Sequence, residues 1–381
     1  MTAPIVIIGS GMAGFAVARE FRKLNTDAPL LMITQDDGTS YSKPMLSTGF
    51  TKKKSADDLA MANAVAMSEQ LNMSIRTRTN VDEIDPANKS LNIAGETLPY
   101  DKLVIATGAQ VNTAPFLENA SSNICSINDL DDYRAFREKL KGKKRVAIIG
   151  TGLIGCEYAN DLIQGGYQVQ LISPASTVLD TLLPSEASAC LKEALVAAGA
   201  SLHLNQSVTA LADDEDNVRI MLASGDELTA DLVISAIGLR PNIQLATKAK
   251  LETNLGIVCD RTLRTSAPDI YAIGDCAEVD GFVLLYVLPL MAGARALAQS
   301  LNGNITQVSY GVMPVVVKTP VCPVVVQPPA SNEGTWSTES DGFSSTSLNK
   351  ASDGSLLGFA LTGDAIRQKQ ALAKQVKGLH A

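Results

Sequence analysis

A strand, a glycine-rich turn and a helix follow one another twice along this chain, and that repeat limits the possible folds more than any other feature. In the first copy, residues 5–8 are a β-branched run, residues 9–14 form the turn and residues 15–24 have a helical pattern. In the second copy, residues 145–149 precede a turn at residues 150–155. Each copy continues into a further apolar strand. The repeat therefore predicts two α/β units of one type.

Both turns have the spacing G-x-G-x-x-G, which suits a bound pyrophosphate. The glycines allow a tight turn, let the backbone approach the phosphates and let the helix pack closely on the strand. The start of the helix then supplies free amide groups and a partial positive charge. We therefore expect the two turns to bind two dinucleotides. The residues of these binding turns are Gly9, Gly11, Met12, Ala13 and Gly14 in the first unit and Gly150, Gly152, Leu153, Ile154 and Gly155 in the second.

An acidic residue about 20 positions after such a turn hydrogen-bonds the adenosine ribose. Asp36 stands 22 positions after Gly14 and is the predicted residue. Asp37 is its competitor, and a solvated turn acid is the alternative. The second unit has Ser173 and Pro174 at the corresponding place, without an acid, Arg or Lys. Because nothing there prepares the pocket for a 2′-phosphate, the sequence favours NADH over NADPH.

The chain beyond about residue 314 changes to short β-rich runs separated by prolines and polar turns, which predicts a small separate domain. Within it, residues 335–353 are rich in Ser, Thr, Asp and Gly, and we expect a mobile hairpin connection there. The predicted fold class is α/β, with two Rossmann-like dinucleotide-binding domains plus a small C-terminal α+β domain. The expected boundaries are 1–113 and 246–313 for a discontinuous first domain, 114–245 for the second and 314–381 for the third.

Composition and charge exclude several classes of function. The chain has 381 residues and a formal net charge of −8, which argues against nucleic-acid binding because phosphates require a cationic surface. The longest apolar run, residues 282–294, is too short to cross a bilayer, and the first residues lack a basic signal segment. We therefore expect a cytoplasmic protein without a membrane helix. Six cysteines without metal-binding spacing and only two histidines disfavour a metal site and a His-based triad.

Several motifs in combination resemble those of the two-dinucleotide-binding flavoprotein reductases. They are the two glycine turns, Ala106-Thr107-Gly108, Gly238-Leu239-Arg240-Pro241-Asn242 and Gly274-Asp275. The resemblance covers roughly residues 4–312. Within that family, residues 41–50, 274–281 and 284–291 are similar to the rubredoxin reductases of bacterial alkane degradation, and the similarity reaches the tail at residues 317–320 and 322–323.

The resemblance implies that the first turn binds FAD and the second binds NADH. It also implies that Asp275 hydrogen-bonds the ribityl chain or a nearby phosphate of the flavin, whereas a cap of the following helix is the alternative. The segment after Pro289 would begin a helix whose amides face the flavin pyrimidine edge, where reduction places negative charge. Further implied contacts are Pro44, Val81, Ala106, Thr107, Gly108, Val287 and Leu288 to FAD, and Gly238 to NAD.

Three charged residues are candidates for tuning the flavin and the nicotinamide. Lys43 stands where related ferredoxin-type reductases carry an Arg before Pro, and Glu157 follows the second glycine turn, so we expect these two to form a charge pair. Those relatives have a further Lys five positions later, where this chain has Thr48. A surface lysine and an ordinary first-turn helix acid are the alternatives. The resemblance adds Lys318 as a residue at the flavin edge.

Redox-active thiols are not expected in this chain. Disulfide reductases of this architecture need a C-x-x-C or C-x4-C pair, and the related peroxidases need a single Cys within residues 42–49; neither is present. We therefore predict no covalent catalytic residue. The resemblance implies hydride transfer from NADH to FAD, followed by two single-electron transfers to rubredoxin, which would supply an alkane hydroxylase.

The acceptor is expected to be a transient partner of a monomeric enzyme. Lys52, Lys53 and Lys54 form a cationic run that suits an acidic carrier, although a solvated lysine turn is the alternative. The tail lacks the His-Glu elements through which dimeric disulfide reductases complete each other's sites. Two other functions stay open: a reductase of ferredoxin or another one-electron carrier, and a slow redox-sensing interaction flavoprotein.

Overall fold

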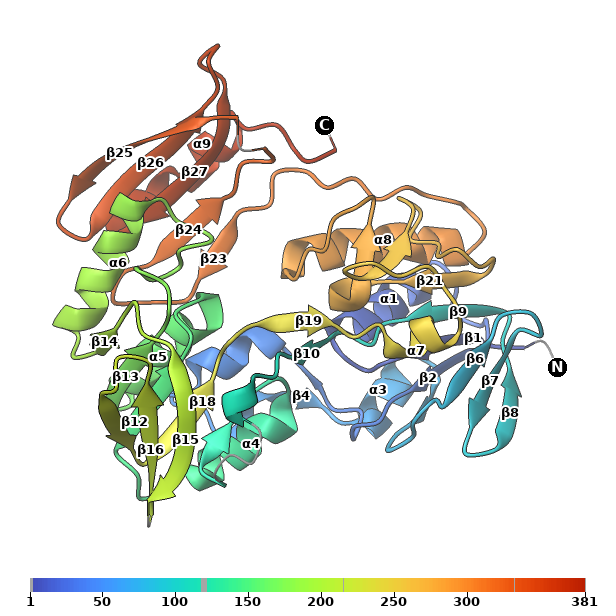
Figure 1. Cartoon of the computed structure of the whole chain (residues 1–381). Coiled ribbons are helices and arrows are strands. Elements are labelled where there is room, and N and C mark those ends of the chain that lie inside the picture. Colours follow the sequence, from blue (N-terminus) through green and yellow to red (C-terminus); the bar gives the residue numbers. More distant parts are fainter. Residues whose placement is uncertain (1–2, 118–121, 215, 332, 381) are drawn as a thin grey trace.

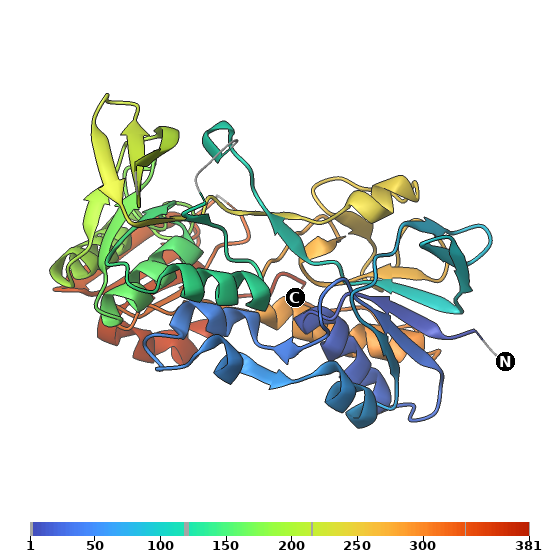
Figure 2. The same ribbon diagram turned by 90° about the horizontal axis from the view of Figure 1, so that it is seen from below.

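Three five-stranded sheets organise the described part of the chain. The computed structural model describes residues 3–117, 122–214, 216–331 and 333–380. Figure 1 shows the first α/β unit at one end and the second unit at the other, with the C-terminal strands beside the second. Seen from below, the molecule is elongated (Figure 2). The predicted fold class, with two dinucleotide-binding domains and a small third domain, is confirmed.

The sheet of the first unit is parallel and has the order β21-β9-β1-β2-β5. All four residues of the central strand β1 are buried, as expected where both faces of a parallel sheet are covered. The strands are β1 (Ile5–Ile8), β2 (Leu30–Ile33), β5 (Ser74–Arg76), β9 (Lys102–Ile105) and β21 (Ile270–Ala272). Because β21 follows the whole second unit in sequence, this sheet joins two distant parts of the chain.

Helices α1 (Met12–Arg22) and α8 (Val287–Leu301) pack against each other in the first unit. Both begin earlier than predicted. The turn glycines precede α1 so closely that its first residue is Met12 rather than residue 15, and α8 includes Pro289 in its first turn, where a missing N–H costs no helical hydrogen bond.

Smaller elements complete the first unit. They are β3 (Ser40–Tyr41), η1 (Lys43–Thr48), α2 (Ala56–Leu59), β4 (Ala60–Ala62), α3 (Ala64–Gln70), β6 (Glu83–Asp85), β7 (Ser90–Ile93), β8 (Glu96–Pro99), α7 (Gln244–Lys248), β20 (Ile257–Cys259), η3 (Gly274–Cys276) and β22 (Ala277–Val279). Strands β10 (Ala109–Val111) and β19 (Leu239–Pro241) pair antiparallel and carry the chain between the two units (Figure 1).

The second unit repeats the parallel arrangement in the order β11-β18-β12-β13-β14. Its elements are η2 (Pro115–Leu117), β11 (Ile124–Cys125), α4 (Leu130–Lys139), β12 (Arg145–Ile149), α5 (Leu153–Gln164), β13 (Gln168–Ile172), α6 (Ser185–Ala197), β14 (Ser201–His203), β15 (Val208–Asp214), β16 (Asn217–Leu222), β17 (Glu227–Ala230) and β18 (Leu232–Ser235). Strands β15 to β17 form a separate antiparallel sheet.

The C-terminal domain is an antiparallel sheet of order β23-β24-β27-β26-β25 with a short helical end. Its elements are β23 (Val315–Val317), β24 (Val324–Gln327), β25 (Thr335–Asp341), β26 (Ser344–Lys350), β27 (Leu356–Thr362), η4 (Gly363–Gln368) and α9 (Lys369–Ala373). Residues 335–350 do form a hairpin, but it is not a connection outside the sheet, because its strands β25 and β26 are two of the five strands of this sheet. Their polar side chains are accommodated by exposure on the edge strand β25 and by pairs such as Thr338 Oγ1 to Ser347 Oγ at 2.8 Å.

The C-terminal domain shares its core with the second unit. Val315, Val317 and Val324 belong to the same buried cluster as Val146 and Leu171 of the second sheet. The two parts are therefore held together by apolar burial. Among the described residues, we find no helix with both the length and the hydrophobicity required to cross a bilayer.

Candidate active site between the two glycine turns

One cavity of about 1670 Å³ extends from the first glycine turn to the second. The walls come from both α/β units and from strand β23 with Lys318 beyond it. Pockets for a single small ligand usually measure roughly 300–1,000 Å³. The cavity therefore has room for two large ligands that meet within one space.

The glycine turns form two open cradles on this cavity. A Cβ atom added at Gly11 or Gly152 would meet no atom within 4 Å. In contrast, a Cβ at Gly14 would lie 2.0 Å from the Gly9 carbonyl oxygen, and one at Gly155 would lie 2.0 Å from the Gly150 oxygen. The first pair of glycines thus leaves space for a ligand, whereas the second pair allows the helix to pack on the turn.

Three helices present uncapped N-termini to the cavity. Gly11, Gly152 and Tyr286 precede α1, α5 and α8 in extended conformation, and none of these three residues makes a side-chain capping hydrogen bond. The first turns of these helices contain no Asp or Glu. Their free amides and partial positive charge suit phosphate groups at the two glycine turns and an electron-rich ring edge at α8.

Asp36 is held at the cavity by the turn that it follows. Its Oδ1 accepts hydrogen bonds from Ser10 Oγ (2.7 Å), Thr34 Oγ1 (2.7 Å) and the Gly38 amide (2.8 Å). Asp37 is not among the residues that line the cavity. The geometry thus supports Asp36 rather than Asp37 as the ribose ligand, with Oδ2 left for a sugar hydroxyl.

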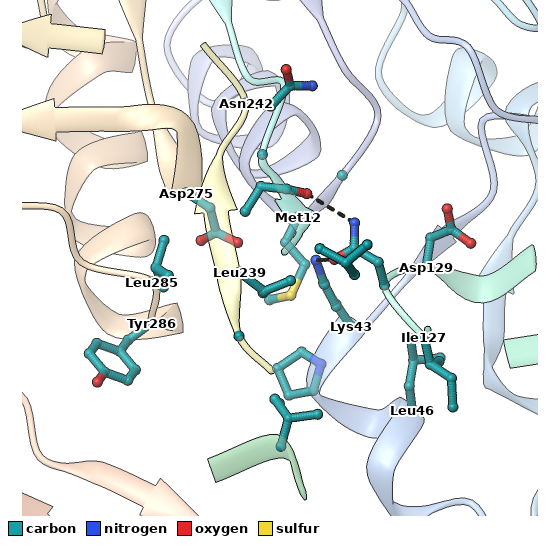
Figure 3. Close-up of a pocket in the computed structure, with 18 of the residues that line it drawn as sticks. Met12, Lys43, Leu46, Ile127, Asp129, Leu239, Asn242, Asp275, Leu285 and Tyr286 are labelled. Carbon is teal, nitrogen blue, oxygen red and sulfur yellow. Dashed lines mark hydrogen bonds between the residues drawn. The ribbon is translucent and has the colours of Figure 1, made fainter. Parts of the chain in front are cut away.

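Lys43 and Asp275 project into the same part of the cavity from η1 and η3 (Figure 3). Burial raises the pKa of the Asp275 carboxyl, and Lys43 acts in the opposite direction. Burial likewise lowers the pKa of Lys43, opposed chiefly by Asp275. Lys43 Nζ donates to Asn128 Oδ1 at 2.7 Å, and Asn128 Nδ2 donates to the Ala109 carbonyl. Asp275 makes no hydrogen bond to another described residue, so its carboxylate is available to a ligand.

The expected pair between Lys43 and Glu157 was wrong, because Glu157 pairs with Lys318. Glu157 is fully buried and accepts hydrogen bonds from Lys318 Nζ (2.5 Å), the Lys318 amide (2.8 Å) and Ser47 Oγ (2.6 Å). Lys318 directly follows β23, so the third domain supplies the cation. One buried cluster consequently connects all three parts of the protein at the cavity wall.

Most residues expected from the sequence come together on this cavity. Of the residues expected to contact FAD, these are Gly9, Gly11, Met12, Ala13, Asp36, Lys43, Pro44, Val81, Ala106, Thr107, Gly108, Asp275, Val287, Leu288 and Lys318; of those expected to contact NAD, they are Gly150, Gly152, Leu153, Ile154, Glu157 and Gly238. Gly14, Gly155 and Pro289 do not line it; the two glycines allow the helices to pack on their turns, and Pro289 is buried in the first turn of α8. Sequence reasoning missed Ser47 and Asn128, which are single polar residues without any spacing signal.

Thiols take no part in this site. All six cysteines are free and buried, and none of them lines the cavity. Within the described residues, moreover, no three His, Cys, Asp or Glu side chains are grouped to hold a metal ion.

The chain is similar to known proteins along its whole length. Residues 3–308 match the family model of the pyridine nucleotide-disulphide oxidoreductases, and residues 307–376 match that of the rubredoxin binding C-terminal domain. The rubredoxin-NAD(+) reductase of Alcanivorax borkumensis is 50% identical over 378 residues, which are 99% of each chain. The enzyme of that name from Acinetobacter baylyi is 44% identical over 99% of this chain and 98% of its own.

Among solved structures, a ferredoxin reductase from Rhodopseudomonas palustris has a similar fold. Its TM-score is 0.89 at 24% sequence identity, covering 99% of this chain and 96% of that chain.

Proposed function

Since the chain belongs to the pyridine nucleotide-disulphide oxidoreductase family, whose members use FAD and NADH, we propose that it passes electrons from NADH through FAD to rubredoxin. The observation that carries this proposal is the single cavity between the two glycine turns, with the third domain forming part of its wall. Two nucleotides bound at the turns would meet beside the domain that resembles a rubredoxin-binding module.

FAD, when bound, accepts a hydride and releases electrons one at a time. The residues of this chain bind and orient the two nucleotides. Gly11 and the free amides of α1 suit the FAD pyrophosphate, Asp36 its ribose and Asp275 its ribityl chain. The start of α8 offers amides to the ring edge that becomes negative.

The cluster of Glu157, Lys318 and Ser47 holds together the part of the cavity wall where the two ligands would meet. Glu157 holds the Lys318 ammonium by an ion pair that is neutral as a whole, and the more exposed ammonium is the positive end of this fixed dipole at the cavity. Such a dipole would stabilise the electron-rich ring of either ligand without reorganising during the reaction. Because no cysteine lines the cavity, electrons would leave directly for the external carrier.

The carrier would dock at the apolar rim of the cavity. Leu288 at the start of α8 and Val316 of β23 line the cavity and are 48% and 49% exposed. Such a small apolar patch fits a transient electron-transfer contact. The run Lys52 to Lys54 is also exposed but does not line the cavity, so it would steer an acidic carrier from a distance.

An anaerobic titration tests the proposed function. The purified protein should be yellow, NADH should bleach it, and rubredoxin should restore the colour faster than ferredoxin does. A colourless protein that does not bind FAD would contradict the proposal. If ferredoxin reoxidised the protein faster than rubredoxin does, ferredoxin would be the carrier instead of rubredoxin. Slow bleaching by NADH would instead favour a redox-sensing role.

Two variants separate the docking elements. Val316→Asp should raise the KM for rubredoxin at every salt concentration, whereas reversing the charges of Lys52, Lys53 and Lys54 should raise it only at low salt. Reduction of ferricyanide serves as the control and should not change in either variant.

We extend the proposal to a cytoplasmic, monomeric enzyme that supplies electrons to alkane oxidation and does not bind nucleic acid. The six free buried cysteines suit a reducing compartment, and the net charge of −8 disfavours nucleic acid. Light scattering after gel filtration measures the oligomeric state, and a mass near 40.1 kDa is expected.

A further inference from the structure

The end of strand β13 lacks the acidic residue that would mark the ribose site of the second nucleotide. Ser173 stands there, is buried, and its hydroxyl oxygen accepts a hydrogen bond from the Ala175 amide. Ser173, Pro174 and Ala175 line the cavity but carry no charge. The second unit must therefore recognise the sugar with a residue from another segment or not at all.

The loop that follows returns to the second glycine turn and is fixed there. The Leu179 amide donates to the Thr151 carbonyl at 2.9 Å, and Thr151 Oγ1 donates to the Thr177 carbonyl at 3.4 Å. Val178 and Leu179 are fully buried, and Leu179 adopts a φ of 50°, which is rare for a branched residue. The backbone just before residue 180 is thus anchored against the turn that binds the nucleotide.

Asp180 is the first exposed residue after this anchor, and it lines the cavity. It stands 25 positions after Gly155, later than the usual spacing of about 20. Asp180 makes no hydrogen bond or ion pair with another residue in the described part of the chain. Its carboxylate is consequently free to accept hydrogen bonds from a ligand.

The charges that the second unit itself supplies suit a neutral sugar rather than a phosphate. Of the cavity-lining residues that the described second unit contributes, none is Lys or Arg. Its two other acids are engaged, since Glu157 is paired with Lys318 and Asp129 Oδ1 accepts a hydrogen bond from the Asp132 amide at the start of α4. A carboxylate accepts hydrogen bonds from vicinal ribose hydroxyls but repels a 2′-phosphate.

We propose that Asp180 accepts hydrogen bonds from the adenosine ribose hydroxyls of NADH and thereby selects NADH against NADPH. This inference rests on the proposed function, because it takes NADH as the ligand of the second glycine turn. Asp180 is a specificity residue that lies at the nucleotide end and takes no part in the electron transfer.

Calorimetry on the FAD-loaded protein tests the inference with two redox-inactive probes, ADP-ribose and 2′-phospho-ADP-ribose. The wild type should bind ADP-ribose at least about tenfold more tightly, as expected for charge-assisted hydrogen bonds. Asp180→Asn should weaken ADP-ribose binding about tenfold and so reduce the ratio of the affinity for ADP-ribose to that for 2′-phospho-ADP-ribose. Asp180→Arg should reverse the preference, so that 2′-phospho-ADP-ribose binds more tightly. Asp213→Asn removes an exposed carboxylate of the same unit away from the cavity and should leave the ratio unchanged.

The outcomes separate this inference from the function on which it rests. If the wild type binds ADP-ribose and Asp180→Asn has the same ratio of affinities for the two probes, the role of Asp180 is refuted, whereas the proposed NADH site is still supported. If the wild type binds neither probe nor NADH, both proposals fail. If Asp213→Asn changed the ratio of affinities as much as Asp180→Asn does, the cause would be a general charge effect, and the role of Asp180 would also be refuted.

Discussion

At the scale of single residues, the ion pair between Glu157 and Lys318 is the most consequential contact. Glu157 has no exposure, and all three of its hydrogen-bond donors come from elements other than its own helix. Burying a carboxylate is costly unless it is paired and hydrogen-bonded. The pair therefore makes the domain arrangement a condition for a stable second unit.

Removing the ammonium should expose this dependence. Lys318→Met leaves Glu157 buried without a counter-charge and should lower the free energy of unfolding by about 3 kcal/mol, the lower end of the usual range because Lys318 keeps 27% exposure. Urea denaturation measures the loss. The double variant Glu157→Gln/Lys318→Met should recover most of it, and Lys369→Met, which has no ion pair among the described residues, should lose little. A double variant as unstable as Lys318→Met would contradict the pairing.

Asp275 gives a pH-dependent prediction. Burial raises the pKa of Asp275, so in the FAD-depleted protein the ionised carboxylate opposes folding at neutral pH. Asp275→Asn should therefore be more stable than the wild type at pH 7. The difference should shrink as the pH falls through the raised pKa and vanish below about 3.9, the pKa in unfolded chains. Urea midpoints between pH 3.5 and about 8 check the trend.

The same variant should lose FAD because the ligand-facing carboxylate is gone. Asp180→Asn, at the other end of the cavity, is the matched control and should retain FAD. Unchanged flavin retention in Asp275→Asn would refute the assigned contact, independently of the stability result.

At the scale of elements, each strand-turn-helix unit uses different residues to leave space for a ligand and to pack its helix against the turn. The two functions reside on different glycines of one turn, since a Cβ added at Gly9 or Gly14 would meet backbone, whereas Gly11 faces open space. The uncapped starts of α1 and α5 are the complement of this arrangement, because a side-chain cap would occupy the site of the phosphate.

Alanine substitutions should distinguish these roles. Gly11→Ala should fold with a nearly unchanged melting temperature but bind FAD at least about tenfold more weakly, because the methyl group enters the pyrophosphate space. Gly14→Ala should destabilise the fold itself, and Gly152→Ala should impair NADH binding while keeping FAD. Calorimetric titration and thermal melts measure both effects. Equal destabilisation by Gly11→Ala and Gly14→Ala would contradict this division.

At the scale of the whole molecule, the C-terminal domain is part of the second unit's core as well as the wall of the cavity. Val315, Val317 and Val324 are buried against residues of the second sheet. Full burial of such a side chain contributes roughly 1.5–3 kcal/mol. The third domain is consequently a structural requirement for the NAD side of the protein.

Truncation after Pro314 should therefore destabilise the second unit. The shortened chain loses several buried valines and the counter-charge of Glu157, and it should aggregate or melt at a clearly lower temperature than the full chain. Differential scanning calorimetry with and without FAD measures the change. A truncated protein with the full chain's melting temperature would show that the shared core is not needed for stability.

The sequence by itself determined the architecture, because its signals are local. Strand, turn and helix are adjacent in the chain, and G-x-G-x-x-G needs no partner to be recognised. Strands β1 and β12 have the predicted boundaries, and the family resemblance is confirmed. Composition failed locally at residues 335–353, since Ser and Thr are common both in loops and on exposed edge strands.

Only the tertiary structure decided which charged residues meet. Glu157 and Lys318 are 161 positions apart, and no spacing rule states that β23 brings Lys318 rather than Lys43 to Glu157. Asp180 was equally hidden, because its place depends on a buried loop that folds back onto the second glycine turn. Short-range patterns are written in the order of residues, whereas pairing between distant charges follows from how the sheets and domains pack.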